Sequence, residues 1–334
     1  MEDETQNQTT EEMINQPPKK DHFLGMSILV SAIILAGAWI YTTGLKANNA
    51  LQRETAVSDS NKTSVSTLEE KVLPSEGVVL PVTWGDLGVK LVSVGAINAD
   101  KFKAMYVQRG TFTEEYKNLL LGKNNDKLKM TKDNAGYLLN LFWALGLASK
   151  NPILDSGEMK NPVYGGAGNF ASTGGWTIAK GSPMDHYSSH SFFALSREQQ
   201  ALVDKVSRGI YRPCCGNSTN FPDCNHGMAM LGLLELMASQ GVSEQDIWKT
   251  ALAVNSYWFP DTYLTIAAYM KNKGVDWNDV NPQEILGINY SSAQGYASIA
   301  SQIIQPQRER GGSGCGVDAG ETATPQRQQS GCGI

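Results

Sequence analysis

The longest apolar stretch of the chain lies near its N-terminus, between Phe23 and Leu45. These 23 residues include no Asp, Glu, Lys, Arg or His. At 1.5 Å of rise per residue, a helix of this length crosses the roughly 30 Å hydrocarbon layer of a bilayer. Trp39 and Tyr41 near its end suit the aromatic belt at a membrane interface. The pattern predicts a single transmembrane helix over 23–45, with the lipid bilayer as a partner.

Polar segments flank this stretch and close the chain. Residues 1–22 are acidic, 46–77 are rich in Ser, Thr, Asn and Glu, and 306–334 form a Gly- and Gln-rich tail with GCG motifs around Cys315 and Cys332. Such compositions favour a solvated tail, a spacer and a disordered end. The positive-inside tendency of an uncleaved signal anchor places 1–22 in the cytoplasm and the bulk of the chain outside it, at the cell membrane. A signal peptide cleaved after the apolar stretch is the alternative.

Between residues 78 and 305 the hydrophobic pattern is mainly helical. The stretch YLLNLFWALGLA, which ends at Ala148, is apolar on nearly every face but too short to span a bilayer, so it predicts a buried central helix capped by Thr131. Alternating patterns are scarce, and VVLPV at 78–82 is the best candidate strand. The expected fold class is mainly α, a single transmembrane helix followed by an extracytoplasmic helical bundle. Capping residues indicate further helix starts at Ser196 with Gln199, Ser243 with Asp246, and Asn281 before Pro282.

Charge and motif content exclude several classes of function. The chain has 334 residues and a net charge of −5; without the 2 basic and 6 acidic residues of 1–22, 26 basic side chains remain against 27 acidic ones. That balance gives no basic surface, so no nucleic-acid partner is expected. The motifs GxxxxGK[ST], GxGxxG after a strand, HExxH and CxxCH are all absent, so the sequence predicts no nucleotide and no c-type haem. No hydrolase or other enzyme class is assigned.

The densest chemical signal is the sequence RPCCGNSTNFPDCNHG. Its metal-ligating side chains, within 13 residues, are Cys214, Cys215, Cys224 and His226. Three sulfurs and one imidazole are the ligand set of a closed tetrahedral zinc site, and soft thiolates also suit Cu(I). Asp223 is expected to cap the next helix, so Cys224 lies in its first turn, where the helix dipole favours a thiolate. A disulfide from Cys214 or Cys215 to Cys224 is the competing interpretation.

A second constellation is SPMDHYSSHSFF at 182–193. Ser182 and Pro183 are typical of a helix start, so His186 and His190, four residues apart, are expected on one helix face. Such a pair can hold Zn or Cu. We expect both histidines to be additional ligands near the cysteines, because all three histidines of the folded part lie within 41 residues that also contain its three cysteines.

Other candidate residues have structural interpretations. Glu235, in the apolar stretch LLELM, is expected to be a carboxylate on a helix surface, with a buried acid as the alternative. Met228, Met230 and Met237 of the same helix are expected to pack in the core. The glycine-rich segment 161–181 is expected to be an irregular connection.

The chain also resembles known proteins in several motifs. The segments GGWTIAKG, MDHYSSHSFF, GIYRPCCGNSTNFPDCNHGMAMLGLLELMASQG and NSYWFPDTYL, between Leu80 and Tyr269, resemble an uncharacterised family of bacterial single-pass membrane proteins with no established activity. The PCCG run is distantly similar to small exported proteins that carry PCYCGC, although it lacks that alternation. This second resemblance implies export and metal handling and identifies no reaction.

These features predict a membrane-anchored, extracytoplasmic protein that binds a transition metal, Zn or Cu. The expected ligands are Cys214, Cys215, Cys224 and His226, with His186 and His190 in addition. One alternative is a thiol–disulfide redox protein in which Cys224 reacts and Cys214 or Cys215 resolves. Another is a cell-envelope interaction module with a structural disulfide, which contacts an envelope protein through the YGGAGNF loop.

Overall fold

The computed structural model describes residues 66–304, which form a mainly helical domain with a small β-sheet. No helix among these residues is both long and apolar enough to cross a membrane. The predicted fold class, a transmembrane helix followed by a helical bundle, is therefore wrong on this finding, and the membrane and signal-anchor assignment is corrected with it. The segment Phe23–Leu45, the acidic tail 1–22 and the C-terminal tail 306–334 lie outside the described residues.

The described chain begins within the segment expected to be a spacer. Residues 66–72 are helical, and Val72 and Leu73 are buried in the core. The carbonyl of Pro74 accepts a hydrogen bond of 2.8 Å from the Tyr257 hydroxyl, 183 residues away along the chain. The last part of this polar segment is thus packed against the domain, which starts before residue 78.

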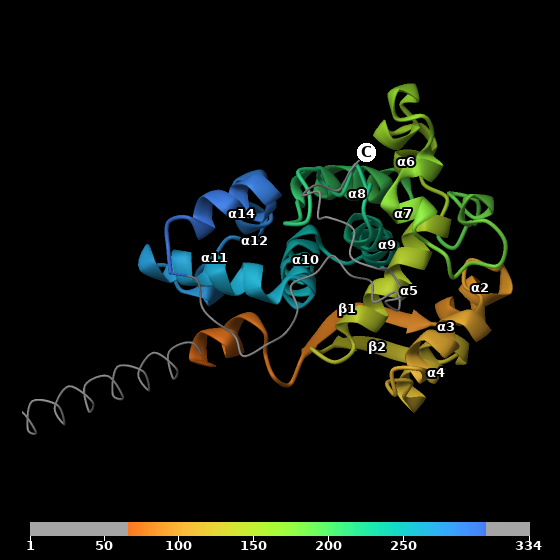
Figure 1. The fold of residues 1–334 in the computed structure, drawn as a ribbon, viewed down its shortest axis with the longest axis horizontal. Helices are drawn as coiled ribbons and strands as arrows, with labels where there is room; N and C mark the ends of the chain where they lie inside the picture. The colour runs from red at the N-terminus through yellow and green to blue at the C-terminus, as the bar shows by residue number, and fades with distance from the viewer. Residues whose placement is uncertain (1–65, 305–334) are drawn as a thin grey trace, which may run out of the picture. The chain divides into compact units, whose positions relative to one another are not determined.

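A two-stranded antiparallel sheet forms one side of the domain (Figure 1). Strand β1 (Val78–Gly85) confirms and extends the predicted strand, because Leu80, Val82 and Trp84 alternate into the core. Its partner β2 (Asn125–Met130) was not predicted, since NDKLKM buries only two apolar side chains. Three helices connect the strands, namely α2 (Leu87–Ser93), α3 (Ala99–Val107) and α4 (Glu114–Leu121).

The core is built on helices α5 (Ala135–Ala148) and α9 (Asn225–Ser239), which make the most extensive helix–helix contact of the described chain (Figure 1). Both are buried on nearly every face, which confirms the predicted central helix and the core role of the α9 methionines. Thr131 does not cap α5 itself: its hydroxyl accepts from the Asn134 amide, and the helix begins at Ala135.

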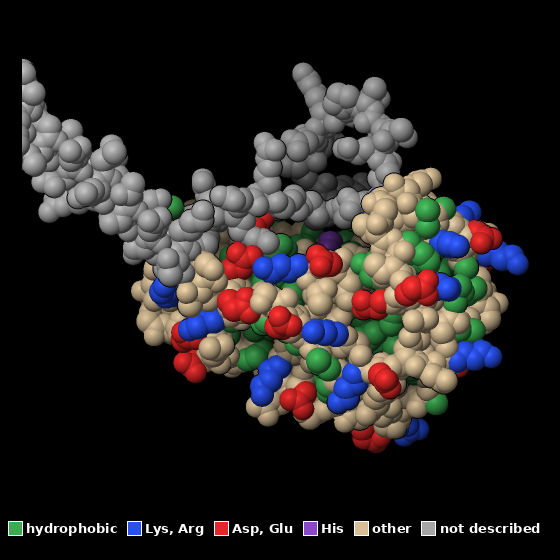
Figure 2. Space-filling view, turned by 90° about the horizontal axis from the view of Figure 1, so that it is seen from below, with side chains coloured by type: hydrophobic (Ala, Val, Ile, Leu, Met, Phe, Trp, Pro, Cys, Tyr) green, Lys and Arg blue, Asp and Glu red, His purple; other side chains and the backbone are tan. Residues whose placement is uncertain are grey.

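The remaining helices pack around this pair. The predicted starts of α8, α10 and α12 are confirmed, since Ser196, Ser243 and Asn281 each accept a hydrogen bond from a backbone amide in the first turn. The helices are α6 (Pro152–Ser156), α7 (Ala171–Gly174), α8 (Arg197–Gly209), α10 (Glu244–Trp258), α11 (Pro260–Asn272), α12 (Pro282–Ile285), α13 (Ile288–Ser291) and α14 (Ala293–Ala300). Short 3-10 turns are η1 (Glu158–Lys160), η2 (Pro162–Tyr164), η3 (Ala167–Asn169), η4 (Pro183–Asp185) and η5 (Trp277–Asp279). On the face shown in Figure 2, basic and acidic side chains are interspersed.

Two glycines allow α5 and α9 to approach each other backbone to backbone. A Cβ at Gly146 would lie 2.1 Å from the Met228 carbonyl oxygen, and a Cβ at Gly232 would lie 2.5 Å from the Phe142 carbonyl oxygen. Neither distance is possible between non-bonded atoms, so any side chain at either position forces the helices apart. Since α9 carries Cys224 at its N-terminal end, this contact also sets the depth at which that residue lies.

Replacing Gly146 by alanine should therefore destabilise the domain, by about 1–3 kcal/mol or more, because the added methyl group overpacks the helix contact. Gly136→Ala in the same helix is the matched control, since nothing lies within 4 Å of a Cβ there and alanine favours a helix by about 0.5–1 kcal/mol. Urea unfolding followed by circular dichroism measures both. Equal effects of the two substitutions would contradict the proposed role of the glycine contact.

Candidate metal centre

The loop between α8 and α9 is folded around the buried side chain of Arg212, which is 1% exposed. Its guanidinium donates to the carbonyl oxygens of Asn217 at 3.1 Å and Phe221 at 3.0 Å, and it forms an ion pair with Asp223. Its Nε donates to Cys224 Sγ at 2.9 Å. A buried charge requires such partners, because desolvation costs several kcal/mol. Arg212 therefore fixes the loop and the Cys224 sulfur together.

The close fit of this guanidinium depends on a residue without a side chain. A Cβ at Gly227, in the first turn of α9, would lie 2.5 Å from Arg212 Cζ. The planar guanidinium consequently packs directly against the helix backbone. This contact explains how a side chain as large as arginine is accommodated next to the N-terminus of a buried helix.

Cys224 is the N-cap residue of α9, where backbone amides lack partners within the helix. The sequence correctly predicted a cysteine at this helix start, but Asp223 is not the cap; its carboxylate binds Arg212 and the Asn217 amide instead. The helix N-terminus and the nearby guanidinium both place positive electrostatic potential at the Cys224 sulfur. This environment favours a thiolate.

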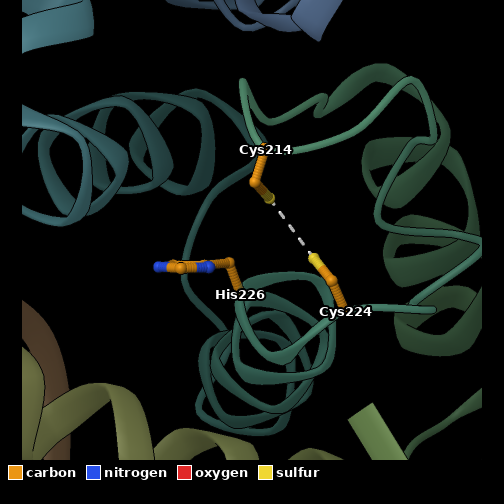
Figure 3. Close-up of side chains that lie close together, drawn as sticks. All are labelled: Cys214, Cys224 and His226. Atoms are coloured by element: carbon orange, nitrogen blue, oxygen red, sulfur yellow. Dashed lines mark hydrogen bonds between the residues drawn. The ribbon is translucent and has the colours of Figure 1, made fainter. Parts of the chain in front are cut away.

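Cys214 and His226 complete a group of three potential ligands around Cys224. The sulfurs of Cys214 and Cys224 are 3.4 Å apart, and a ring nitrogen of His226 lies within 4.8 Å of both. Figure 3 shows the two cysteine side chains pointing toward each other, with the His226 ring extending away from them in this view. No disulfide joins Cys214, Cys215 or Cys224. Three of the four ligands predicted in this loop therefore converge.

Cys215 belongs to a second group that shares Cys224. Its sulfur lies 3.9 Å from the Asp223 carboxylate and 4.0 Å from the Asn217 carbonyl oxygen. The ligand atoms of Cys215, Asp223 and Cys224 all lie within 4.8 Å of one another, but Cys215 does not join the group of Cys214 and His226. Cys214 and Cys215 thus belong to different groups, which share Cys224.

The three thiols of the described loop differ in acidity. Hydrogen bonds with Cys214 and Cys215, reinforced by the Arg212 charge, hold the pKa of Cys224 well below its ordinary value despite burial. For Cys215, a hydrogen bond with Cys214 lowers the pKa, but the bond with Cys224 and burial outweigh it and raise the pKa to about 12. The surroundings therefore favour the thiolate form of Cys224 and the neutral thiol form of Cys215.

Two aromatic rings pack against the imidazole of His226. The His226 ring lies 4.3 Å from the Phe259 ring and 5.8 Å from the Trp258 ring, between ring centroids. Both aromatic residues lie at the C-terminal end of α10, in the run that the sequence shows as YWFP. His226 itself is 5% exposed, so protein side chains rather than water surround its ring.

The side chains of His186 and His190, the second predicted pair, lie next to each other but not on the face of a helix. The segment forms only the 3-10 turn η4, and Ser188 has a left-handed φ of 51°, which bends the chain instead of continuing a helix. His186 Nδ1 and His190 Nε2 are 3.2 Å apart, and His186 Nε2 lies 2.9 Å from the Lys180 carbonyl oxygen. Among the described residues, neither histidine joins a group of three potential ligands.

Glu235 is buried, contrary to the expectation of a surface carboxylate. It is 1% exposed in the middle of α9, and one carboxyl oxygen accepts a hydrogen bond from Asn151. The other oxygen, like the Ser149 hydroxyl, has no hydrogen-bond partner among the described residues. Burial raises the pKa of Glu235 well above its ordinary value, more than the neighbouring Asn151 and Ser149 side chains lower it. A neutral carboxylic acid is the form that this environment favours.

Comparison with known proteins adds no family to these observations. No protein-family model, curated protein or solved structure matches the chain. The two resemblances described from its motifs stay predictions, and the centre is interpreted from its own geometry.

Sequence reasoning did not find the role of Arg212 or of its partners. An arginine beside cysteines is ordinarily exposed, and two of its acceptors are backbone carbonyls that no residue type reveals. The one available signal was Gly227, since a glycine in the first turn of an otherwise apolar helix indicates a close approach.

Arg212→Met should destabilise the domain by about 3–5 kcal/mol, because it leaves the Asp223 carboxylate without its cation in a poorly solvated position. Arg208→Met is the matched control: Arg208 pairs with Asp204 on the surface, where such pairs contribute about 0–1 kcal/mol. Chemical denaturation of both variants measures the difference. A loss no larger for Arg212→Met than for the control would show that the buried ion pair does not organise the loop.

Glu235→Gln should stabilise the domain increasingly as pH rises. Because the folded pKa is raised, the native glutamate contributes its stability below the unfolded pKa near 4.5 and loses it as pH rises toward the folded value. The gap between variant and native protein should widen by up to about 1.4 kcal/mol per pH unit in that interval. Denaturation curves across this range measure it, with Glu244→Gln, at a partly exposed residue whose pKa is lowered by its bond with Lys205, as the control that lacks such a rise. A constant gap would show that Glu235 is not protonated.

Proposed function

We propose that the chain binds a divalent transition metal, with zinc the best match, through Cys214, Cys224 and His226. The observation that carries this proposal is the convergence of two sulfurs and one imidazole nitrogen within 4.8 Å. Zinc bonds of about 2.3 Å to sulfur place two thiolates of a tetrahedral site roughly 3.8 Å apart. The 3.4 Å between the Cys214 and Cys224 sulfurs requires only a small outward adjustment to reach that spacing.

Charge balance supports a divalent ion. Two thiolates neutralise Zn²⁺, and the ion pair of Arg212 with Asp223 adds no net charge to the site. Cu(I) would leave one uncompensated negative charge at the same ligands. Cys215 stays protonated in this arrangement, as its raised pKa favours, and it contacts Asp223 rather than the ion. A buried site without net charge is the least costly to form.

The proposal assigns different roles to the residues of the loop. Cys214, Cys224 and His226 supply the ligands; Cys214 is partly buried, whereas Cys224 and His226 are buried. Arg212 holds the Cys224 sulfur by its hydrogen bond, as donors that do not touch the metal orient the ligands in metal sites. With three protein ligands, the site leaves one position open, which a water molecule or an exogenous ligand would take.

Metal analysis of the reduced full chain tests this function. The reconstituted protein should hold about one zinc per chain, and Co²⁺ should give the absorption of thiolate-to-metal charge transfer. Cys224→Ser and His226→Ala should each weaken zinc binding by about 100-fold or more, measured by competition with a chromophoric chelator. His190→Ala and the double variant Cys315→Ser, Cys332→Ser are the controls and should bind zinc as the native chain does.

Circular dichroism of each variant shows whether lost binding reflects lost folding. A folded, fully reduced native chain that retains far less than one equivalent of zinc or cobalt would overturn the proposal. Loss of zinc in His190→Ala, with binding kept in His226→Ala, would place the metal at the other histidine pair instead.

A further inference from the structure

The pair that would bind metal is also placed to form a disulfide. A disulfide needs its sulfurs about 2.05 Å apart, so Cys214 and Cys224 at 3.4 Å are separated by little more than a side-chain rotation. Their side chains point at each other (Figure 3). Cys214 belongs to a turn of the loop, whereas Cys224 is fixed at the helix N-cap, so the movement falls on Cys214.

The surroundings select this pair among the three cysteines. Arg212 Nε donates to the Cys224 sulfur, which lies 3.4 Å from the Cys214 sulfur, while the Cys215 sulfur contacts Asp223 and Asn217. Cys214 is partly exposed, whereas Cys224 is 6% and Cys215 8% exposed. An oxidant from solution therefore meets Cys214 first, and Cys224 is the sulfur next to it.

We propose that Cys214 and Cys224 form a reversible disulfide that empties the metal site, so that metal occupancy follows the thiol redox state. The metal half of this inference rests on the proposed function; the disulfide half stands on the sulfur geometry alone. A bond between the two sulfurs removes both thiolate ligands at once, and His226 alone cannot retain the ion.

The oxidant is a small-molecule disulfide, RSSR, and the exchange proceeds in two steps. The Cys224 thiolate accepts the Cys214 proton as the Cys214 sulfur attacks one sulfur of RSSR, which forms a mixed disulfide and releases RS⁻. The departing RS⁻ takes the Cys224 proton and leaves as RSH. The Cys224 thiolate then attacks the Cys214 sulfur, forms the internal disulfide and releases the second RS⁻. The protein loses two electrons in total, and these leave with the released RSH and RS⁻.

The remaining contacts of Arg212 make this exchange reversible. After oxidation its guanidinium loses the thiolate but keeps Asp223 and the carbonyls of Asn217 and Phe221. The loop therefore stays folded around the same cation in both redox states. Reduction returns two sulfurs to positions already suited to a metal ion.

Titration of the full chain with mixtures of reduced and oxidised glutathione tests the inference, in the Cys315→Ser, Cys332→Ser background that removes the tail thiols. Oxidation should consume about two thiols and release about one zinc per chain, and a reductant should restore both. Peptide mapping by mass spectrometry should find the bond between Cys214 and Cys224. Cys215→Ser should behave like the background, whereas Cys214→Ser should form no internal disulfide.

The outcomes separate the inference from the proposed function. If the metal-free protein forms the Cys214–Cys224 bond but the reduced protein binds no zinc, the disulfide stands and the metal function fails. If zinc stays bound with its thiols intact at a glutathione ratio that oxidises the metal-free protein, redox control of the metal is overturned. A mapped bond to Cys215, or no bond in any state, overturns the disulfide itself.

Discussion

A positive charge that water does not reach is the constraint on which this site depends. The guanidinium of Arg212 can remain buried only if its N–H groups are satisfied, and the loop before α9 provides the acceptors. Because the guanidinium is planar and rigid, the positions of two carbonyls, one carboxylate and one sulfur are fixed relative to one another. The reactive sulfur is therefore placed by a hydrogen-bond requirement rather than by its own packing.

The helix core supplies the other half of this arrangement. The glycine contact between α5 and α9 brings the two backbones together and leaves α9 buried along nearly its whole length. Its N-terminal end is the point at which the helix meets the loop and the aromatic residues of α10. Fold and site are consequently linked: the depth of the helix determines where Cys224 and His226 meet Cys214.

Local patterns predicted the local structure well. The apolar run of α5, the strand at 78–82 and the Ser196 cap are encoded within a few neighbouring residues, and each formed as expected. The loop cysteines and His226 were also found, since their residue types alone indicate the chemistry. The predicted spanning helix has no counterpart among the described residues.

What local patterns missed was set by distant partners. Glu235 is buried because Asn151, 84 residues away, donates to it, and nothing in LLELM reveals that amide. His186 and His190 do lie side by side, but through a left-handed residue at position 188 that no helical spacing describes. The separation of Cys215 from Cys214 likewise depends on how the loop bends around Arg212.

The contact between Arg212 and Gly227 also constrains how such a chain can change over evolution. A side chain at position 227 would displace the guanidinium, and a smaller residue at 212 would leave the loop acceptors unsatisfied. Arginine and the glycine three residues after Cys224 should thus be gained or lost together. In a relative that had replaced its cysteines, this pair would still mark the same loop, which makes it a better signature of common descent than the cysteines and His226.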